Sequence, residues 1–213
     1  MRGIRAFGRN EGGLNHTGDF LFLFSPLVSQ LADVAVFSPE LSYSAFYSRN
    51  APADWEEKLE ALGRELESLR LPELKTKNAP QPYYGPGFFP KFAGYVVDDW
   101  NDVMCFKKPF PDWQRLSDAR FSEEHAKGFK TGDNTRLREI YTSLGFYLYF
   151  RNIDACFWEC YAPDAALIEQ LREHFRTHAI DFEELDFSAD FPFGGLKQKR
   201  RFKDVHEIWS PET

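Results

Sequence analysis

The stretch from Gly145 to His178 constrains the fold most strongly. It reads GFYLYFRNIDACFWECY and then APDAALIEQLREHFRTH. Large apolar residues occupy alternate positions on both sides of the turn signal Asn152-Ile153-Asp154, which predicts a β-hairpin. Apolar residues at helical spacing follow, with Asp164 placed as the N-cap, and predict an amphipathic helix. Because both faces of the hairpin carry large apolar groups, we expect it in the middle of a sheet.

Two upstream segments have a similar order, so we predict ββα units at 34–71, 93–128 and 145–178. The first has its turn at Ser38-Pro39-Glu40 and the second at Trp100-Asn101-Asp102. The period near fifty residues fits internal repetition and fits chance recurrence of a common arrangement equally well. Either way the predicted fold class is α+β, an antiparallel sheet built from β-hairpin-plus-helix units with helices mainly on one face.

The length predicts one folded domain preceded by a short arm. Residues 1–18 are rich in Gly and Arg without periodicity, which predicts a flexible N-terminal arm, and residues 19–213 then form a single α+β domain. The apolar run from Phe20 to Phe24 predicts a buried strand. Apolar residues alternate with acids from Ile180 to Phe187, which predicts an edge strand or an extended acidic tract.

Charge and composition restrict the partners. The net charge of −7 disfavours nucleic acid and anionic membranes and favours a basic protein partner. The 22 Phe, 9 Tyr and 5 Trp fit either a ring-packed core or a binding surface. Three cysteines are too few for a disulfide framework, and no signal or membrane segment is evident, so we expect a cytoplasmic protein. The basic segment 197–203 is interpreted as a solvated arm that pairs with the acidic tract.

Histidine and cysteine pairs offer weak metal signals. Cys156 and Cys160 lie four residues apart on a predicted strand, about 13 Å from each other at strand rise, which is too far to share a metal. His174 and His178 have the i, i+4 spacing of a zinc site but lack the HExxH arrangement, and we interpret them as complementing the dipole at a helix end. We therefore predict neither a metal nor another cofactor.

Catalytic motifs are also missing from the sequence: it contains no Gly-x-Ser-x-Gly, phosphate-binding loop or dinucleotide fingerprint. The carboxylates near 98–102 and the Glu123-Glu124-His125 sequence leave one enzymatic alternative open, a small hydrolase using Asp, Glu and His residues near 98–125. We favour a non-enzymatic protein and predict no catalytic residue.

The segment Lys75 to Pro90 contains four prolines and two glycines and predicts a connection, either a plain linker or a stiff binding loop that carries aromatic rings. The acidic turn that follows would face a basic partner. The predicted partner-binding residues are Asp98, Asp99, Trp100, Asp102, Tyr83 and Tyr84.

In overall character the chain resembles bacterial immunity proteins, which neutralise toxins delivered by neighbouring cells. The resemblance rests on FYLYFRNIDACFWECYAPDAALIEQL and on the acidic turn VVDDWND. It implies a protein that occupies a toxin's active site or holds its domain, with carboxylates facing a basic cleft. A structural component of a homo-oligomeric assembly, such as a homodimer, is the remaining alternative.

Overall fold

The computed structural model describes residues 1–6, 19–40, 53–70, 83–93, 101–111, 113–120, 122–152 and 157–191. The strands are β1 Arg2–Ala6, β2 Ala35–Glu40, β3 Tyr83–Tyr84, β4 Asn101–Phe106, β5 Leu148–Asn152, β6 Trp158–Ala162 and β7 Phe182–Asp186. The helices are α1 Asp19–Val28, α2 Trp55–Ser68, α3 Phe88–Phe92, α4 Trp113–Arg120, α5 Glu123–Thr131, α6 Asn134–Leu144, α7 Ala165–Thr177 and α8 Phe187–Asp190, with a 3₁₀ turn at Ser29–Leu31.

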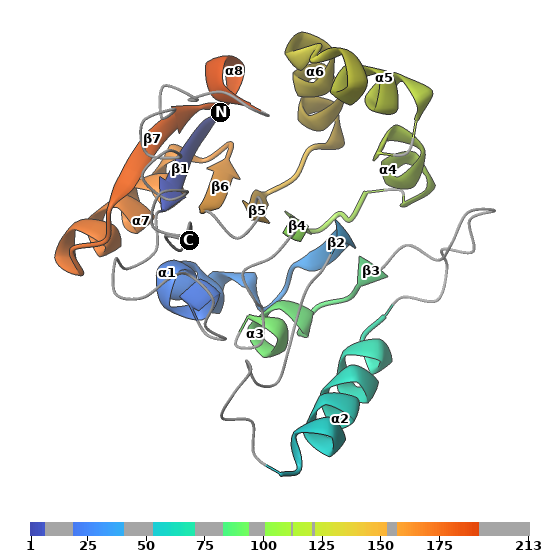
Figure 1. The fold of residues 1–213 in the computed structure, drawn as a ribbon, viewed down its shortest axis with the longest axis vertical. Coiled ribbons are helices and arrows are strands. Elements are labelled where there is room, and N and C mark those ends of the chain that lie inside the picture. The colour runs from blue at the N-terminus through green and yellow to red at the C-terminus, as the bar shows by residue number, and fades with distance from the viewer. Residues whose placement is uncertain are drawn as a thin grey trace, which may run out of the picture.

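The strands form one antiparallel sheet in the order β3-β2-β4-β5-β6-β1-β7. This confirms the predicted α+β class. Helices cover both faces of the sheet, however: α1 and α3 lie on one side of the strands in Figure 1, and α4, α5 and α6 on the other. Helix α7 packs beside α1 on the first face, and α2 contacts α3. The distribution of helices therefore differs from the expected one-sided arrangement.

Side chains that alternate along the strands divide the core into two layers. The first layer, between the sheet and α1, α3 and α7, contains Trp158, Phe150 and the apolar side of α1. The second, between the sheet and α4, α6 and α8, contains Tyr149 and Tyr161. All of these rings are almost completely buried, so the aromatic content serves the core on both faces.

The predicted strands and helix of the stretch 145–178 are present, while Ile153 and Asp154 of the predicted turn lie outside the described residues. Strands β5 and β6 pair antiparallel, with Phe150 opposite Cys160. They lie inside the sheet, flanked by β4 and β1. Helix α7 follows, and the carboxylate of Asp164 accepts a hydrogen bond from the backbone N–H of Ala166 as the predicted N-cap. The acidic stretch that begins near Phe182 is an edge strand, β7, as expected.

The amino terminus was predicted wrongly in part. Residues 2–6 are not a flexible arm but strand β1, which is paired on both sides, with β6 and β7. Ile4 and Ala6 enter the first core layer, while Arg5 points to the second face and is 5% exposed. The sequence pattern misled because an arginine normally indicates solvent, and here it is buried against carboxylates. Residues 7–18 lie outside the described residues.

Residues 20–24 form part of helix α1 and not the predicted strand. The buried positions Phe20, Leu23, Phe24 and Leu27 follow the i, i+3, i+4, i+7 spacing of a helix. The run of five apolar residues hid this period, because Phe22 also packs against its neighbours and Leu21 is exposed. Helix and strand are hard to distinguish in so short an apolar run.

The described residues of both predicted upstream turns belong to strands. Ser38 to Glu40 belong to β2, where the register with β4 shifts between Phe37 and Glu40, as a proline within a strand would favour. Asn101 and Asp102 begin β4, whose two edges pair with β2 and β5. The helix of the first unit, α2, is present. Parts of the first two units lie outside the described residues, so their repetition stays a prediction.

Candidate functional site

The most distinctive polar feature is a row of charged side chains that crosses five neighbouring strands. We call it the charged row: Asp102 on β4, Arg151 on β5, Glu159 on β6, Arg5 on β1 and Glu183 on β7. Each is the direct cross-strand partner of the next in the antiparallel register. Charges of opposite sign alternate along the row. Direct partners place their Cβ atoms about 4.5–5.5 Å apart, so each charge lies close to one of opposite sign.

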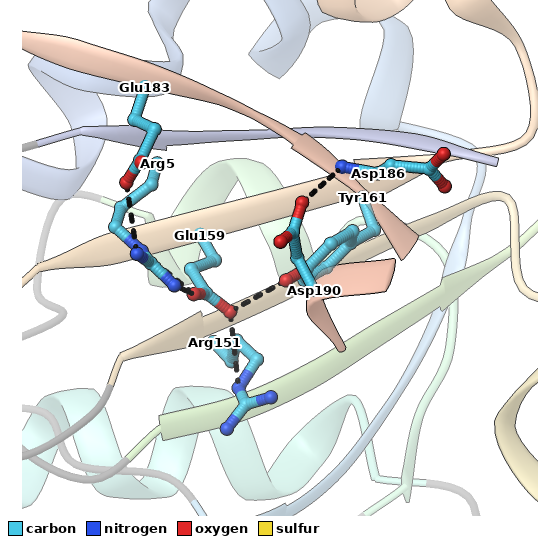
Figure 2. Close-up of polar contacts among 7 residues, drawn as sticks. All are labelled: Arg5, Arg151, Glu159, Tyr161, Glu183, Asp186 and Asp190. Atoms are coloured by element: carbon cyan, nitrogen blue, oxygen red, sulfur yellow. Dashed lines mark hydrogen bonds and ion pairs between the residues drawn. The ribbon is translucent and has the colours of Figure 1, made fainter. Parts of the chain in front are cut away.

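Glu159 is the centre of the charged row and is fully buried. Its Oε1 accepts hydrogen bonds from Nε and Nη2 of Arg5, at 2.9 and 2.6 Å. Its Oε2 accepts one from the hydroxyl of Tyr161 at 3.0 Å and lies 3.6 Å from Nε of Arg151. These contacts, drawn in Figure 2, come from three different strands. Burying a carboxylate requires this degree of compensation, because an isolated charge is very costly away from water.

Each of the two arginines also contacts groups other than Glu159. Nη1 of Arg5 reaches Glu183 at 3.1 Å, and its guanidinium carbon lies 4.4 Å from the ring centre of Phe157. The guanidinium carbon of Arg151 lies 5.2 Å from the ring centre of Phe191. Contact with a ring face is favourable for a buried cation. Both side chains are at most 8% exposed, so solvent screens these interactions little.

Electrostatics raise the pKa values of Arg151, a member of the row, and of Tyr161 beside it. Burial is the largest influence on Arg151 and by itself lowers its pKa, but Glu159 together with Tyr149, Tyr161 and Tyr141 outweighs burial, so the pKa is raised. Burial raises the pKa of Tyr161 well above its usual value, and the neighbouring Glu159 raises it further. Arg151 therefore stays charged and Tyr161 stays neutral at ordinary pH. The row can hold charges and fix the strand register, but neither of these groups is poised to transfer a proton.

Tyr161 also explains the glycine in β1. A Cβ added to Gly3 would lie 2.4 Å from Cδ1 of the Tyr161 ring, which covers it from the neighbouring strand. The ring packs further against Phe187, the first residue of α8, and against Phe191, which follows its last residue. Nearby, the carboxylate of Asp186 caps α8 by accepting from the N–H of Ser188 at 2.8 Å. Hydrogen bonds from the Ser188 hydroxyl and from the Ser188 backbone N–H lower the pKa of Asp186.

The structure places the predicted partner-binding residues in two groups. Tyr83 and Tyr84 form edge strand β3 and are buried, so their rings belong to the core and do not form an exposed binding surface. Asp102 is also buried, as the β4 member of the charged row. Its backbone carbonyl accepts a hydrogen bond from Ser38 Oγ at 2.8 Å. Asp98, Asp99 and Trp100 lie outside the described residues, immediately before the first residue of β4.

Among the described residues of the hydrolase alternative, the histidine and the neighbouring acids are not gathered in an open site. His125, on α5, is buried, with its Nε2 at 3.3 Å from the hydroxyl of Tyr141. Glu123 and Glu124, beside it in the sequence, are exposed. Among the described residues, no group of three or more His, Cys, Asp or Glu side chains could hold a metal ion. The hydrolase stays an untested alternative.

Sequence reasoning missed the charged row, although two signals for it exist. Arg151 and Glu159 are the charged residues within otherwise apolar strands, FYLYFRN and FWECY. A charge in a strand that is apolar on both faces requires a buried partner. The pairing itself could not be read, because Arg5 lies 154 positions from Glu159 in the chain.

Comparisons of the chain with protein-family models, with curated proteins and with solved structures found no match. The described part of the chain contains no helix with the length and apolar character needed to span a membrane.

Proposed function

We propose that the protein binds and inhibits another protein, a basic one, in the manner of bacterial immunity proteins. The observation that carries the proposal is the acidic sheet edge formed by β7. Its side chains Glu184 and Asp186 are exposed, and Glu183 is partly so. Asp181 before the strand and Asp190 in α8 extend the acidic run, and Asp181 is also exposed.

An edge strand presents backbone N–H and C=O groups as well as side chains. Strand β7 is the last in the sheet order and bonds to β1 on one side. Arg172 on α7 binds Glu184 at 2.9 Å, and Arg5 binds Glu183, so two of the acids are partly neutralised inside the protein. The remaining negative charge would attract a basic partner and speed its association.

The apolar surface favours the same kind of partner. Among the described residues, Met1 and Leu21 are the exposed large hydrophobic side chains. A contact dominated by charge and hydrogen bonds therefore fits the described surface better than the broad apolar face of an obligate homo-oligomer. Asp98, Asp99 and Trp100 remain proposed contact residues, on the chain just before β4. The cytoplasmic location also remains part of the proposal.

The decisive experiment couples capture to a biological readout. The protein is immobilised, partners are captured from lysate of its native cell, and each is expressed in a test strain with and without this protein. We expect one basic protein that arrests growth alone and is tolerated on co-expression. If every captured partner is harmless by itself, or if co-expression fails to restore growth, the immunity proposal is wrong.

Charge variants locate the contact. The changes Glu184→Lys with Asp186→Lys reverse the acidic edge, and Asp98→Lys with Asp99→Lys reverse the segment before β4. Glu56→Lys with Glu57→Lys on α2 makes the same net charge change on exposed helical positions and serves as the control. Binding lost equally in all three variants would indicate only long-range attraction, and binding lost in neither test variant would exclude both surfaces.

A further inference from the structure

We propose that His174 and His178, at the carboxyl end of α7, form a two-imidazole site for a divalent transition-metal ion, with Cu²⁺ or Ni²⁺ favoured over Zn²⁺. The inference stands apart from the proposed inhibitory function. It rests on the hydrogen bonds that fix which nitrogen of each ring carries a proton, and on how the two rings lie together.

The Nε2 atom of His174 lies 2.9 Å from the backbone carbonyl oxygen of Phe22, on the neighbouring helix α1. A carbonyl oxygen can only accept, so Nε2 carries the proton and Nδ1 carries a lone pair. Within α1 this carbonyl would normally accept from the N–H four residues later. That residue is Pro26, which has no N–H. The oxygen instead accepts from the hydroxyl of Ser25 at 3.1 Å and from His174.

His178 is oriented in the same way by its own helix. Its Nδ1 lies 2.9 Å from the backbone carbonyl oxygen of His174 and must carry the proton, which leaves the lone pair on Nε2. Metal-binding histidines characteristically donate their second N–H to a carbonyl or carboxylate, because that bond fixes the tautomer and the ring orientation. Both rings of this pair meet that condition.

The separation of the two ring centres is compatible with one shared ion. Residues at i and i+4 lie on one face of a helix, and here the ring centres are 4.3 Å apart. With metal–nitrogen bonds of about 2.0–2.1 Å, two imidazole centres lie ~4.5 Å apart at a 90° angle and ~5.2 Å apart at a tetrahedral one. The observed separation is nearer the 90° value, which is typical of Cu²⁺ and Ni²⁺.

The ring of Phe22 lies against both His174 and His178. Its ring centre lies 5.5 Å from that of His174 and 5.4 Å from that of His178. His174 is partly buried and His178 is exposed, so an ion could reach the pair from solvent. Water or a partner's donor would complete the coordination of the ion.

The test uses the full chain, freed of metal with a chelator and titrated separately with CuCl₂, NiCl₂ and ZnCl₂ by calorimetry. We expect one equivalent of Cu²⁺, bound more tightly than Ni²⁺ or Zn²⁺. Electron paramagnetic resonance of the copper form should show coupling to two imidazole nitrogens. His178→Gln, at an exposed position, should weaken Cu²⁺ binding about tenfold or more, the range seen when metal sites are disrupted.

A matched double variant, His16→Gln with His206→Gln, removes two histidines elsewhere in the chain and should leave the affinity unchanged. The inference is overturned if His178→Gln and His174→Gln both bind as the parent does, or if the control variant is the one that loses binding. Pro26→Ala restores a competing N–H to the Phe22 carbonyl. It should weaken Cu²⁺ binding severalfold although both imidazoles remain. An unchanged affinity would show that Pro26 does not contribute to metal binding.

Discussion

Trp158 and Glu159 are neighbours on β6 and face opposite sides of the sheet. Trp158 packs with its ring centre 4.7 Å from that of Phe20 and 6.2 Å from that of Phe24. Glu159 is held by Arg5, Arg151 and Tyr161. Both residues are completely buried, yet the first is stabilised by apolar area, which is tolerant of geometry, and the second by directed contacts, which are not. The two faces should therefore respond differently to small changes.

The largest effect is expected from Glu159→Gln, a substitution that keeps the shape and removes the charge. Arg5 and Arg151 would stay buried without their shared carboxylate, and breaking a buried ion pair in this way costs about 3–5 kcal/mol. Urea unfolding measures the loss. Glu169→Gln on α7 removes an exposed acid paired with Arg172 and should cost less than about 1 kcal/mol. Equal losses in the two variants would contradict the special status of the charged row.

Alkaline pH probes the opposite, apolar face through Cys105 and Cys160. Burial raises the pKa of both thiols above the ordinary value of 9.0. Their contribution to stability is therefore fully present below pH 9 and is lost as the pH rises above it, because only the unfolded chain then ionises. Each thiol should cost about 1.4 kcal/mol by about pH 10.

The measurement is urea unfolding at about pH 8 and about pH 10 in reductant, compared with Cys105→Ala with Cys160→Ala. The double variant should lose much less stability between the two pH values than the parent. A parent that is equally stable at both would show that these thiols reach solvent.

Gly3→Ala tests the close packing beside the charged row. The added methyl would overlap the Tyr161 ring, and overpacking of this kind costs about 1–3 kcal/mol. Thermal unfolding should show the loss, and it should shrink when Tyr161→Leu is already present, because the ring that causes the overlap is gone. If the two losses simply add, the contact between β1 and β6 is looser than described.

The smallest of the four effects is expected from Asp164→Ala. This residue lies at the start of α7 and belongs to neither face of the sheet, so the variant serves as a reference. It removes the carboxylate that caps α7, which should cost about 1 kcal/mol. Asp164→Asn retains a side-chain acceptor and should recover most of that loss. If Asp164→Ala destabilised the protein as much as Glu159→Gln, the contrast between capping contacts and the charged row would not hold.

Much of the fold could be predicted where the pattern was local. The hairpin from Leu148 to Ala162, the cap at Asp164, the helix that begins at Trp55 and the edge strand at Phe182 follow from periodicity and capping chemistry alone. Such signals depend on neighbours a few residues apart. They failed at Phe20–Phe24, where a five-residue apolar run fits either element, and at Asn101-Asp102, where turn-forming residues sit within a strand.

The candidate site was less accessible to sequence reasoning. The row unites residues from strands at both ends of the chain, and local patterns carry no information on which strands become neighbours. From the sequence, Arg5 was expected to be solvated and the ring of Tyr83 to be exposed. Both residues are buried because of how their strands pair. The tautomers of His174 and His178 likewise depend on a carbonyl from α1 and on a turn of α7.

By itself, the sequence determined that this is an acidic, aromatic-rich α+β protein with a central hairpin and a well-capped helix, because alternation, helical spacing and capping are properties of adjacent residues. Only the tertiary structure decided that the amino-terminal residues form an inner strand, that helices cover both faces, and that Glu159 lies between two arginines. Those outcomes depend on which distant segments bury each other's surface and satisfy each other's charges, and that choice is made by the assembled sheet.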